Sequence, residues 1–214
     1  IWDLCKGTDP VLRLSAIELL TKTGGKSGVW VNPEAHIPDW VMTRLPAQTP
    51  LEGRNIAVVV MSDRASDGTY ADESGQYLVD SLTEMGATLC QYTVIPDNAD
   101  TIESTILGIC ETHDPHVILC TGGTGPGPRD VTPLVLESHL NPELPGLGEW
   151  LRSESAVYTK TAWLSRMGGG LIGRSLIITL PGSLQAVKEC FGIFMEGLPK
   201  AIVMIEKQGR KGRL

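Results

Sequence analysis

Asn55 to Met61 reads NIAVVVM, and the polar triplet Ser62-Asp63-Arg64 follows it at once. A continuous apolar run of this length is typical of a strand that is buried on both faces of a parallel sheet. The polar triplet marks the point where the strand ends. This stretch therefore predicts an α/β domain, and the sequence on either side of it can be compared with that prediction.

Strand-like and helix-like stretches alternate from this point to residue 206. Further strands are predicted over 88–95, 117–120 and 175–180. Helices are predicted over about 72–86, 102–110, 132–140, 148–161 and 184–194, with Thr132 as the N-cap of the third. Repeated strand, loop and helix units predict a doubly wound, mostly parallel sheet with helices on both faces.

The residues before 53 do not show this alternation of strand-like and helix-like stretches. We therefore expect them to form a region separate from the main domain. Residues 1–31 read as a short N-terminal α+β remnant, and residues 32–52 read as a linker that contains four prolines. The main domain is then expected over 53–208. Residues 209–214 are expected to form a solvated basic tail, in a cluster made of Lys207, Arg210, Lys211 and Arg213.

Composition excludes several classes of protein. The 214 residues carry 18 basic and 25 acidic side chains, a net charge of -7, which argues against a broad nucleic-acid surface. No apolar run approaches the roughly 18 residues of a membrane helix, and no signal-peptide pattern opens the chain. The five cysteines include no C-x-x-C pair. We therefore expect reduced thiols and a cytoplasmic protein with no membrane or nucleic-acid partner.

A glycine-rich loop follows the strand predicted at 117–120. It reads Gly122-Gly123-Thr124-Gly125-Pro126-Gly127-Pro128-Arg129-Asp130. Glycines let backbone N–H groups approach a ligand closely, as in cradles for phosphate oxygens. The loop fits neither the dinucleotide fingerprint, because Pro128 stands at the third glycine, nor the P-loop, because no Gly-Lys-Ser/Thr follows it. A tight connection without a ligand is the alternative interpretation.

Asp97 and Asp130 each stand just beyond a predicted strand end. Ligands of open α/β sheets bind beyond the carboxyl ends of the strands, so the two carboxylates are expected to share one cleft. Paired carboxylates that face phosphates usually hold Mg²⁺. Exposed loop aspartates are also common turn-formers, which is the alternative for each residue taken alone.

Two other features are interpreted as structural. Cys110, His113 and His116 are spaced three apart, but Asp114-Pro115 breaks the helix between them and no fourth ligand follows, so we do not expect a zinc site. Trp150 and Trp163 lie in stretches that are predicted to be helical or to flank a strand. We expect them to be packing residues rather than base-stacking platforms.

Taken together, these segments resemble the molybdopterin adenylyltransferases of molybdenum cofactor biosynthesis (MogA/MoaB type). The matching segments run in the family's order over about 150 residues. They are 62–66 with Tyr70 and Asp72, 95–97, 121–126, 129–133, 145–149, 164–166 and 180–183. Their combination is far more specific than any one of them.

The resemblance implies an enzyme that joins molybdopterin to ATP, with Mg²⁺, to give adenylylated molybdopterin and pyrophosphate. It assigns the catalytic and metal-binding roles to Asp97 and Asp130. It implies substrate contacts at Ser62, Asp63, Thr121, Gly122, Gly123, Thr124, Gly125, Pro181, Gly182 and Ser183. It also implies a homo-oligomer, a trimer or a hexamer, and a molybdenum-inserting enzyme as a candidate partner that receives the product.

The N-terminal piece carries a second resemblance, to the end of cyclic pyranopterin monophosphate synthase (MoaC type). Residues 1–6 and 19–28 carry it, and Asp3 and Lys6 match catalytic positions of that family. Because the chain begins with Ile1, we expect a fusion of two enzymes that is seen from the end of its first domain. Lys6 as a solvated helix lysine is the alternative, and we expect no synthase activity from the fragment alone.

A different class of function is also compatible with these segments. The same fold serves in proteins that bind or assemble, so a scaffold module could hold molybdopterin without adenylylating it. Retention of both aspartates favours the enzyme.

Overall fold

The computed structural model describes residues 18–22, 30–42 and 49–211, which fall into two compact units, 1–48 and 49–214. In the first unit, strand β1 (Thr21–Lys22) pairs antiparallel with strand β2 (Trp30–Val31), and a short helix α2 (Asp39–Met42) follows. The side-chain amide of Asn32 donates to Glu18 Oε1 (3.0 Å) and to the carbonyl of Leu19 (3.2 Å). Asp3 and Lys6, the synthase-like positions, lie outside the described residues.

The last residues of the expected linker belong to the second unit. Leu51 is fully buried in its core, and the Leu51 N–H donates to the carbonyl of Met85 at 3.0 Å. The structural boundary at residues 48 and 49 therefore precedes the expected start of the main domain at 53.

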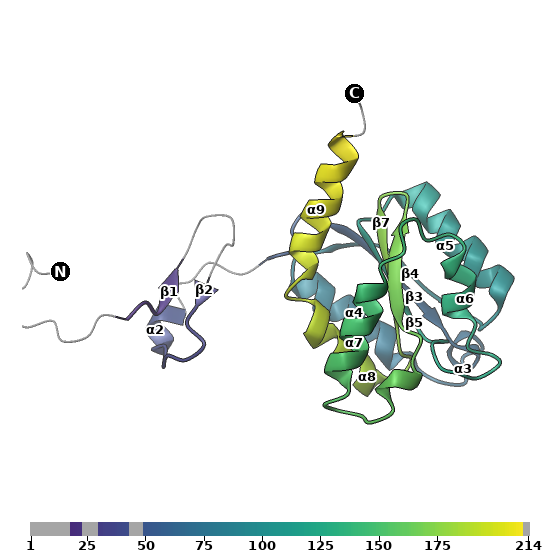
Figure 1. Cartoon of the computed structure of the whole chain (residues 1–214), viewed down its shortest axis with the longest axis horizontal. Helices are drawn as coiled ribbons and strands as arrows, with labels where there is room; N and C mark the ends of the chain where they lie inside the picture. Colours follow the sequence, from purple (N-terminus) through teal and green to yellow (C-terminus); the bar gives the residue numbers. More distant parts are fainter. Residues whose placement is uncertain (1–17, 23–29, 43–48, 212–214) are drawn as a thin grey trace, which may run out of the picture. The chain divides into compact units, whose positions relative to one another are not determined.

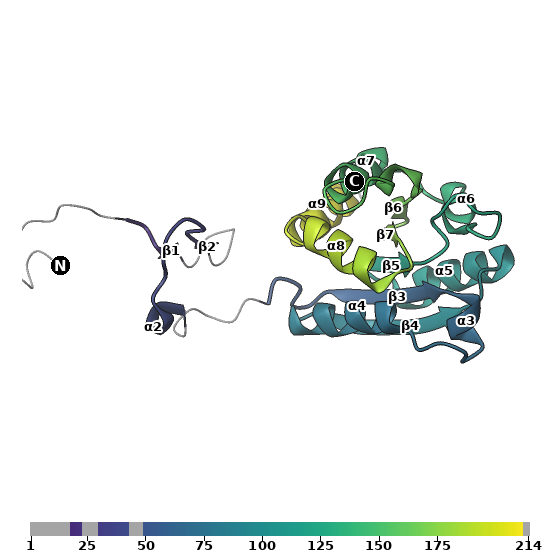
Figure 2. The ribbon, with the colours of Figure 1, turned by 90° about the horizontal axis from the view of Figure 1, so that it is seen from below.

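The second unit is built on a five-stranded sheet in the order β4-β3-β5-β7-β6 (Figure 2). Its strands are β3 (Asn55–Met61), β4 (Thr88–Ile95), β5 (Val117–Thr121), β6 (Gly168–Ile172) and β7 (Ser175–Leu180). All neighbouring pairs are parallel except β6 with β7. The mostly parallel sheet predicted from the sequence is confirmed.

Helices cover both faces of this sheet because its central strands point apolar side chains to both sides (Figures 1 and 2). Ile56, Val58 and Val60 of β3 pack into one core, and Ala57, Val59 and Met61 into the other. The first core is closed by α4 (Glu73–Glu84), α7 (Pro145–Ser155), α8 (Leu184–Phe194) and α9 (Leu198–Lys211). The second is closed by α5 (Ala99–His113) and α6 (Thr132–Glu137).

Several elements differ from the sequence-based expectation, among them β6, α7 and α9. Strand β6 was missed, because Gly168-Gly169-Gly170 has none of the β-branched residues that signal a strand. Helix α7 begins at Pro145 and ends at Ser155, earlier than predicted at both ends, because proline suits the first helical turn. Helix α9 continues to Lys211, so residues 209–211 of the expected tail are helical.

The two tryptophans expected to be packing residues lie outside the core of this unit and are exposed. Trp150 is 42% exposed and Trp163 is 71% exposed. Helix α7 instead turns Gly148, Leu151 and Ser155 inward, so that Trp150 faces away from the core. Among the helices of the described residues, none has the length and apolar character needed to cross a bilayer.

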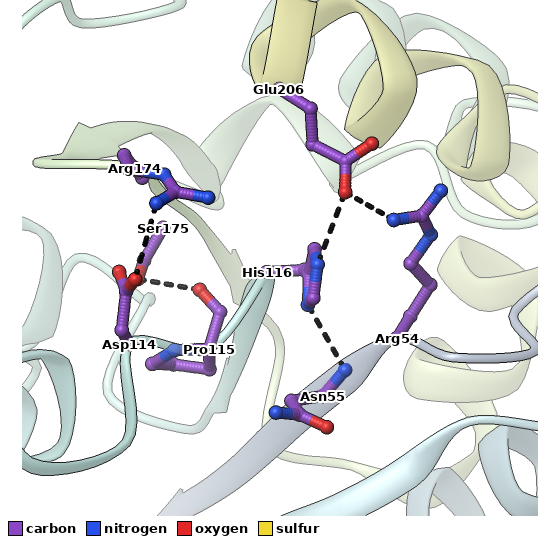
Figure 3. A network of polar contacts seen from close by, with 8 residues as sticks. All are labelled: Arg54, Asn55, Asp114, Pro115, His116, Arg174, Ser175 and Glu206. Atoms are coloured by element: carbon purple, nitrogen blue, oxygen red, sulfur yellow. Dashed lines mark hydrogen bonds and ion pairs between the residues drawn. The ribbon is translucent and has the colours of Figure 1, made fainter. Parts of the chain in front are cut away.

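At the amino-terminal ends of the strands, a polar network ties α9 to the sheet (Figure 3). His116 accepts a hydrogen bond from the Asn55 N–H at Nδ1 (3.0 Å), and its Nε2 lies 3.2 Å from Glu206 Oε1. Glu206 also pairs with Arg54. Both ring nitrogens of His116 are thus engaged within the fold. Nearby, the Ser175 hydroxyl donates to the carbonyl of Pro115 at 2.6 Å.

We expect the Glu206→Gln substitution to loosen this attachment of α9. Glu206 is about three-quarters buried and serves two cationic or donor groups, so losing its charge should cost about 1 to 2 kcal/mol. In a domain of this size that lowers the midpoint of thermal unfolding by roughly 2 to 8 °C. Arg174→Ala is the matched control. Its pair with Asp114 is 63% and 60% exposed, so its effect should be below about 0.5 kcal/mol.

Candidate functional site

The loops that follow β3, β4, β5 and β7 meet at the carboxyl-terminal edge of the sheet. The chain passes from β3 to β4 on one side and then crosses to β5 on the other side of β3. Such a reversal leaves a crevice between the two central strands, which is the usual ligand site of doubly wound sheets. Ser62-Asp63-Arg64 and the glycine loop border this crevice.

Gly122 sets how closely the two central loops approach. Its φ is 109°, and a Cβ atom placed on it would lie 2.1 Å from the carbonyl oxygen of Met61. Any other residue would push the glycine loop away from the end of β3. Beside it, the Gly122 N–H donates to the Leu180 carbonyl at 3.1 Å, and the Thr121 hydroxyl donates to the Pro181 carbonyl at 2.7 Å. The loops after β3, β5 and β7 are thereby joined.

A cleft of about 570 Å³ lies over these loops. The predicted site residues in its wall are Ser62, Thr121, Gly122, Gly123, Thr124, Gly125, Asp130, Pro181, Gly182 and Ser183. Asp63 and Asp97 line a second pocket, of about 440 Å³, together with Arg64, Arg129 and Asp130. Ser62, Arg64 and Asp130 border both hollows, so the two adjoin. Their binding and catalytic roles stay predictions.

Three carboxylates gather in the second pocket. The Asp63 N–H donates to Asp97 Oδ2 at 3.2 Å, and the Asp97 N–H donates to Asp63 Oδ1 at 3.0 Å. Asp130 Oδ2 accepts from the Gly127 N–H at 2.8 Å. Among the described residues, the one cation paired with the group is Arg129, whose Nη1 lies 3.3 Å from Asp63 Oδ2 and whose side chain is 83% exposed. The reciprocal bonds fix Asp63 against Asp97.

Burial raises the pKa of Asp97 above the ordinary carboxyl value, and the neighbouring charges of Asp63 and Asp130 add to the rise. The Asp63 N–H and the charge of Arg129 act in the opposite direction. The three carboxylates of the pocket thus outnumber the two arginines in its wall, Arg64 and Arg129. In the described part of the chain, Asp97 Oδ1 and Asp130 Oδ1 accept no hydrogen bond.

This arrangement fits a divalent ion that is completed by a ligand. No three His, Cys, Asp or Glu side chains of the described residues form a ready-made metal cage. Mg²⁺ is commonly held by one or two carboxylates together with substrate phosphates, and it demands no such cage. The free oxygens of Asp97 and Asp130 and the excess negative charge suit that mode.

Other groups shape the cleft that the sequence did not single out as site residues. The Arg166 side chain donates through Nε and Nη2 to the Gly125 carbonyl, at 3.1 and 2.8 Å, and also reaches the Asp130 carbonyl. Thr124 Oγ1 and Ser165 Oγ lie 3.2 Å apart. Arg166 comes from the segment before β6, 36 residues beyond Asp130 in the chain. The available signal was the segment 164–166, which carried the resemblance.

The rim of the cleft carries an aromatic and basic pair. The Arg64 guanidinium lies 5.6 Å from the centre of the Tyr70 ring, and both side chains line the cleft. Asp72 caps α4 by accepting the Gly75 N–H at 2.9 Å, and it accepts the Tyr92 hydroxyl at 2.6 Å. The strand β4 and the start of α4 are thereby held together beside the cleft.

The four described cysteines take no part in the site. Cys90, Cys110, Cys120 and Cys190 are free thiols, and burial raises the pKa of each. A raised pKa keeps a thiol protonated and poorly nucleophilic. Cys5 lies outside the described residues.

The raised pKa of Asp97 predicts that Asp97→Asn stabilises the metal-free chain at neutral pH. Because the carboxyl pKa is higher in the folded than in the unfolded state, the Asp97 contribution to stability is present below about pH 4 and is lost as the pH rises through the folded-state pKa. The amide removes that loss and keeps an oxygen for the Asp63 N–H. Thermal unfolding in a chelator should give a higher midpoint for the variant at pH 7 and no difference near pH 3. A lower midpoint at pH 7 would contradict this electrostatic picture.

The fold and its cleft define the class of protein: a doubly wound α/β domain with a glycine-lined cleft and an acidic pocket at its topological switch point. The family model described as "Probable molybdopterin binding domain" matches residues 57–200. A molybdopterin adenylyltransferase of Helicobacter pylori (strain 26695) is 37% identical over 153 residues, which cover 71% of this chain and 87% of the relative. The chain belongs to this molybdopterin-binding family.

Two further comparisons extend over different parts of the chain. The "Molybdenum cofactor biosynthesis bifunctional protein" of Synechococcus elongatus is 35% identical over 206 residues, 96% of this chain. The chain spans 62% of the length of that relative. The crystal structure of the molybdopterin biosynthesis enzyme MoaB from Thermus thermophilus superposes with a TM-score of 0.66 at 30% identity, covering 71% of this chain and 96% of that one.

Proposed function

We propose that the domain from residue 49 onward adenylylates molybdopterin with ATP, releasing pyrophosphate. The observation that carries this proposal is the junction of two hollows: a glycine-lined cleft and a pocket with three carboxylates, which share Ser62, Arg64 and Asp130 in their walls. Adenylyl transfer needs a place for two phosphate-bearing substrates and for a cation between them. The names of the relatives, molybdopterin adenylyltransferases, support the same activity.

In the reaction, an oxygen of the terminal phosphate of molybdopterin forms a bond to the α-phosphorus of ATP. The bond between that phosphorus and the bridging oxygen to the β-phosphate breaks, and pyrophosphate leaves with the electron pair. No covalent intermediate with the protein is needed. The contribution of the chain is therefore alignment and electrostatics.

The residues of the two hollows have distinct parts in this proposal. The N–H groups of Gly123 to Gly125 and of Gly182-Ser183 would donate to phosphate oxygens, while Arg166 keeps the glycine loop in shape through the Gly125 carbonyl. Asp97 and Asp130 would hold Mg²⁺ through their free oxygens. That ion, when bound, neutralises charge on the phosphates as the bond breaks.

The activity is first tested with two single-site variants, Asp97→Asn and Asp130→Asn. Each variant keeps an oxygen for its backbone hydrogen bond but weakens the site for a divalent cation. We expect ATP-dependent pyrophosphate release with molybdopterin to fall at least about 100-fold, while the Kd for molybdopterin changes less than about threefold. Turnover is measured by a coupled phosphate assay.

Asp114→Asn is the control for that pair. Asp114 lies before β5 at the opposite edge of the sheet, and its left-handed φ of 39° is one that asparagine also adopts. It should leave turnover unchanged. Full activity in both site variants would remove the metal role of Asp97 and Asp130.

A binding module without catalysis is the second candidate. The family description, a probable molybdopterin binding domain, specifies binding rather than transfer. In that case the wild-type chain binds molybdopterin but releases no pyrophosphate from ATP. The same assay on the wild-type chain therefore distinguishes the two functions.

We further propose that the region before the linker is the end of a cyclic pyranopterin monophosphate synthase-like domain and that the whole protein is a fusion. The alignment with the bifunctional Synechococcus elongatus relative, which extends over 96% of this chain, supports that proposal. The boundaries 1–31 for the fragment and 32–52 for the linker remain proposals. We place the reaction in the cytoplasm, since the described thiols are all free, with a molybdenum-inserting enzyme as the receiver of the product.

We also propose a homo-oligomer, a trimer or a hexamer, that covers the apolar residues exposed around α7 and the short helix η1 (Ala162–Leu164). These are Leu144, Trp150, Val157, Tyr158, Trp163 and Leu164, which are between 36% and 78% exposed. An apolar patch of this extent is typical of an interface between protein chains. Light scattering on the wild-type chain should give a mass of three or six chains, and Trp163→Asp should reduce it to one. A wild-type monomer at micromolar concentration would refute the oligomer.

A further inference from the structure

Thr132 carries a buried hydroxyl with no hydrogen-bond partner. Thr132 is 0% exposed, and among the described residues its Oγ1 is the one buried side-chain nitrogen or oxygen that has no partner. Native structures rarely leave such a group unpaired, because its hydration is lost without compensation. The hydroxyl therefore requires an explanation.

Helix capping does not explain it. A threonine at the start of a helix usually accepts an N–H of the first turn, as the sequence predicts for Thr132. In the structure the N-cap of α6 is Val131, and no side-chain cap bond is made. Thr132 is instead the first helical residue, which turns its side chain inward. The expected N-cap role is thus wrong.

The Thr132 hydroxyl lies close to Asp97, one of the carboxylates of the acidic pocket. A Cβ atom placed on Gly123 would lie 2.4 Å from Thr132 Oγ1 and 3.3 Å from Asp97 Oδ1. These two oxygens therefore border the same small space next to the Gly123 backbone, whose φ is 62°. The absence of a side chain on Gly123 leaves this space open.

Next to Gly123, both the Thr132 hydroxyl and the Asp97 Oδ1 atom are without a hydrogen bond to the described residues. Asp97 Oδ2 accepts the Asp63 N–H, whereas Asp97 Oδ1 accepts no hydrogen bond from the described residues. The two other threonines near the loop are already paired: Thr121 with the Pro181 carbonyl at 2.7 Å and Thr124 with Ser165 at 3.2 Å. Thr132 alone of the three keeps its hydroxyl unpaired.

We propose that Thr132 is a positioning residue whose hydroxyl donates to Asp97 Oδ1 when the pocket holds its cation and phosphates. This inference rests on the proposed function. A carboxylate oxygen has two lone pairs, so a bond from Thr132 leaves one for a cation. Outer partners of this kind hold ligating carboxylates in place. The Thr132 hydroxyl, which has no partner in the described structure, gains one when the cation and phosphates bind, and this favours the bound state.

Thr132→Val tests this role, with Thr132→Ser as the conservative rescue. In a chelator and without nucleotide, we expect Thr132→Val to unfold at the same temperature as the wild-type chain or higher, because the methyl replaces a hydroxyl that has no partner. By calorimetric titration with Mg²⁺ and ATP, its affinity should fall about ten- to hundredfold. Thr132→Ser should bind within about threefold of the wild-type chain, since it keeps the donor.

Thr179→Val is the matched control for a buried threonine. Thr179 is 3% exposed, and its Oγ1 accepts from the Gly168 N–H at 2.9 Å and donates to the Gly168 carbonyl at 3.1 Å. It lines neither hollow of the site. Its loss should lower the unfolding temperature and leave Mg²⁺ and ATP affinity unchanged, the reverse of the pattern expected for Thr132→Val.

The outcomes separate this inference from the proposed function. Destabilised Thr132→Val with unchanged Mg²⁺ and ATP affinity would make the hydroxyl structural and overturn the positioning role. A wild-type chain that binds Mg²⁺ and ATP but releases no pyrophosphate would remove the enzymatic function alone, and the affinities would still decide the role of Thr132. A wild-type chain that binds neither would overturn both.

Discussion

The site depends on the close approach of two loops at the centre of the sheet. Gly122 packs against the carbonyl of Met61 with no room for a side chain, and this contact brings the end of β5 to the end of β3. The Asp63–Asp97 backbone pairing then adds the end of β4, and the Gly122–Leu180 hydrogen bond adds the end of β7. Four loops that are far apart in sequence are thereby held in one place, and this is what turns separate aspartates into a pocket.

The strands of the fold could be predicted because burial on both faces leaves a plain signal. Val117 to Cys120 is a continuous apolar run and Ser175 to Leu180 is a mostly apolar one, and the observed β5 and β7 coincide with them or extend one residue further. Strand β6 could not be found in this way. Its pairing with β7 depends on close backbone contacts that only glycine permits, so it has the composition of a loop.

The aspartates of the site could be located from the sequence because strand ends fix where loops begin. Asp97 and Asp130 each follow a predicted strand, and the structure brings both to one pocket. Arg166 and the unpaired hydroxyl of Thr132 could not be located so. The contacts of Arg166 with the glycine loop arise from tertiary packing across a long stretch of chain, and burial without a partner is a property of packing that no local pattern encodes.

The two edges of the sheet differ in how their charges are matched, and the difference marks where ligands belong. At the amino-terminal edge, Glu206 serves both Arg54 and His116, and Asp114 pairs with Arg174, so each of these charges has a partner within the fold. At the carboxyl-terminal edge, three carboxylates share a pocket with two arginines, Arg64 and Arg129, of which Arg129 alone forms an ion pair with them among the described residues. A buried hydroxyl there has no partner in the described part of the chain. Unmatched groups of this kind are characteristic of sites that another molecule completes. The unmatched groups lower the stability of the fold at this edge, and we interpret them as prepared for ligand binding. The polar network at the opposite edge holds α9 against the sheet.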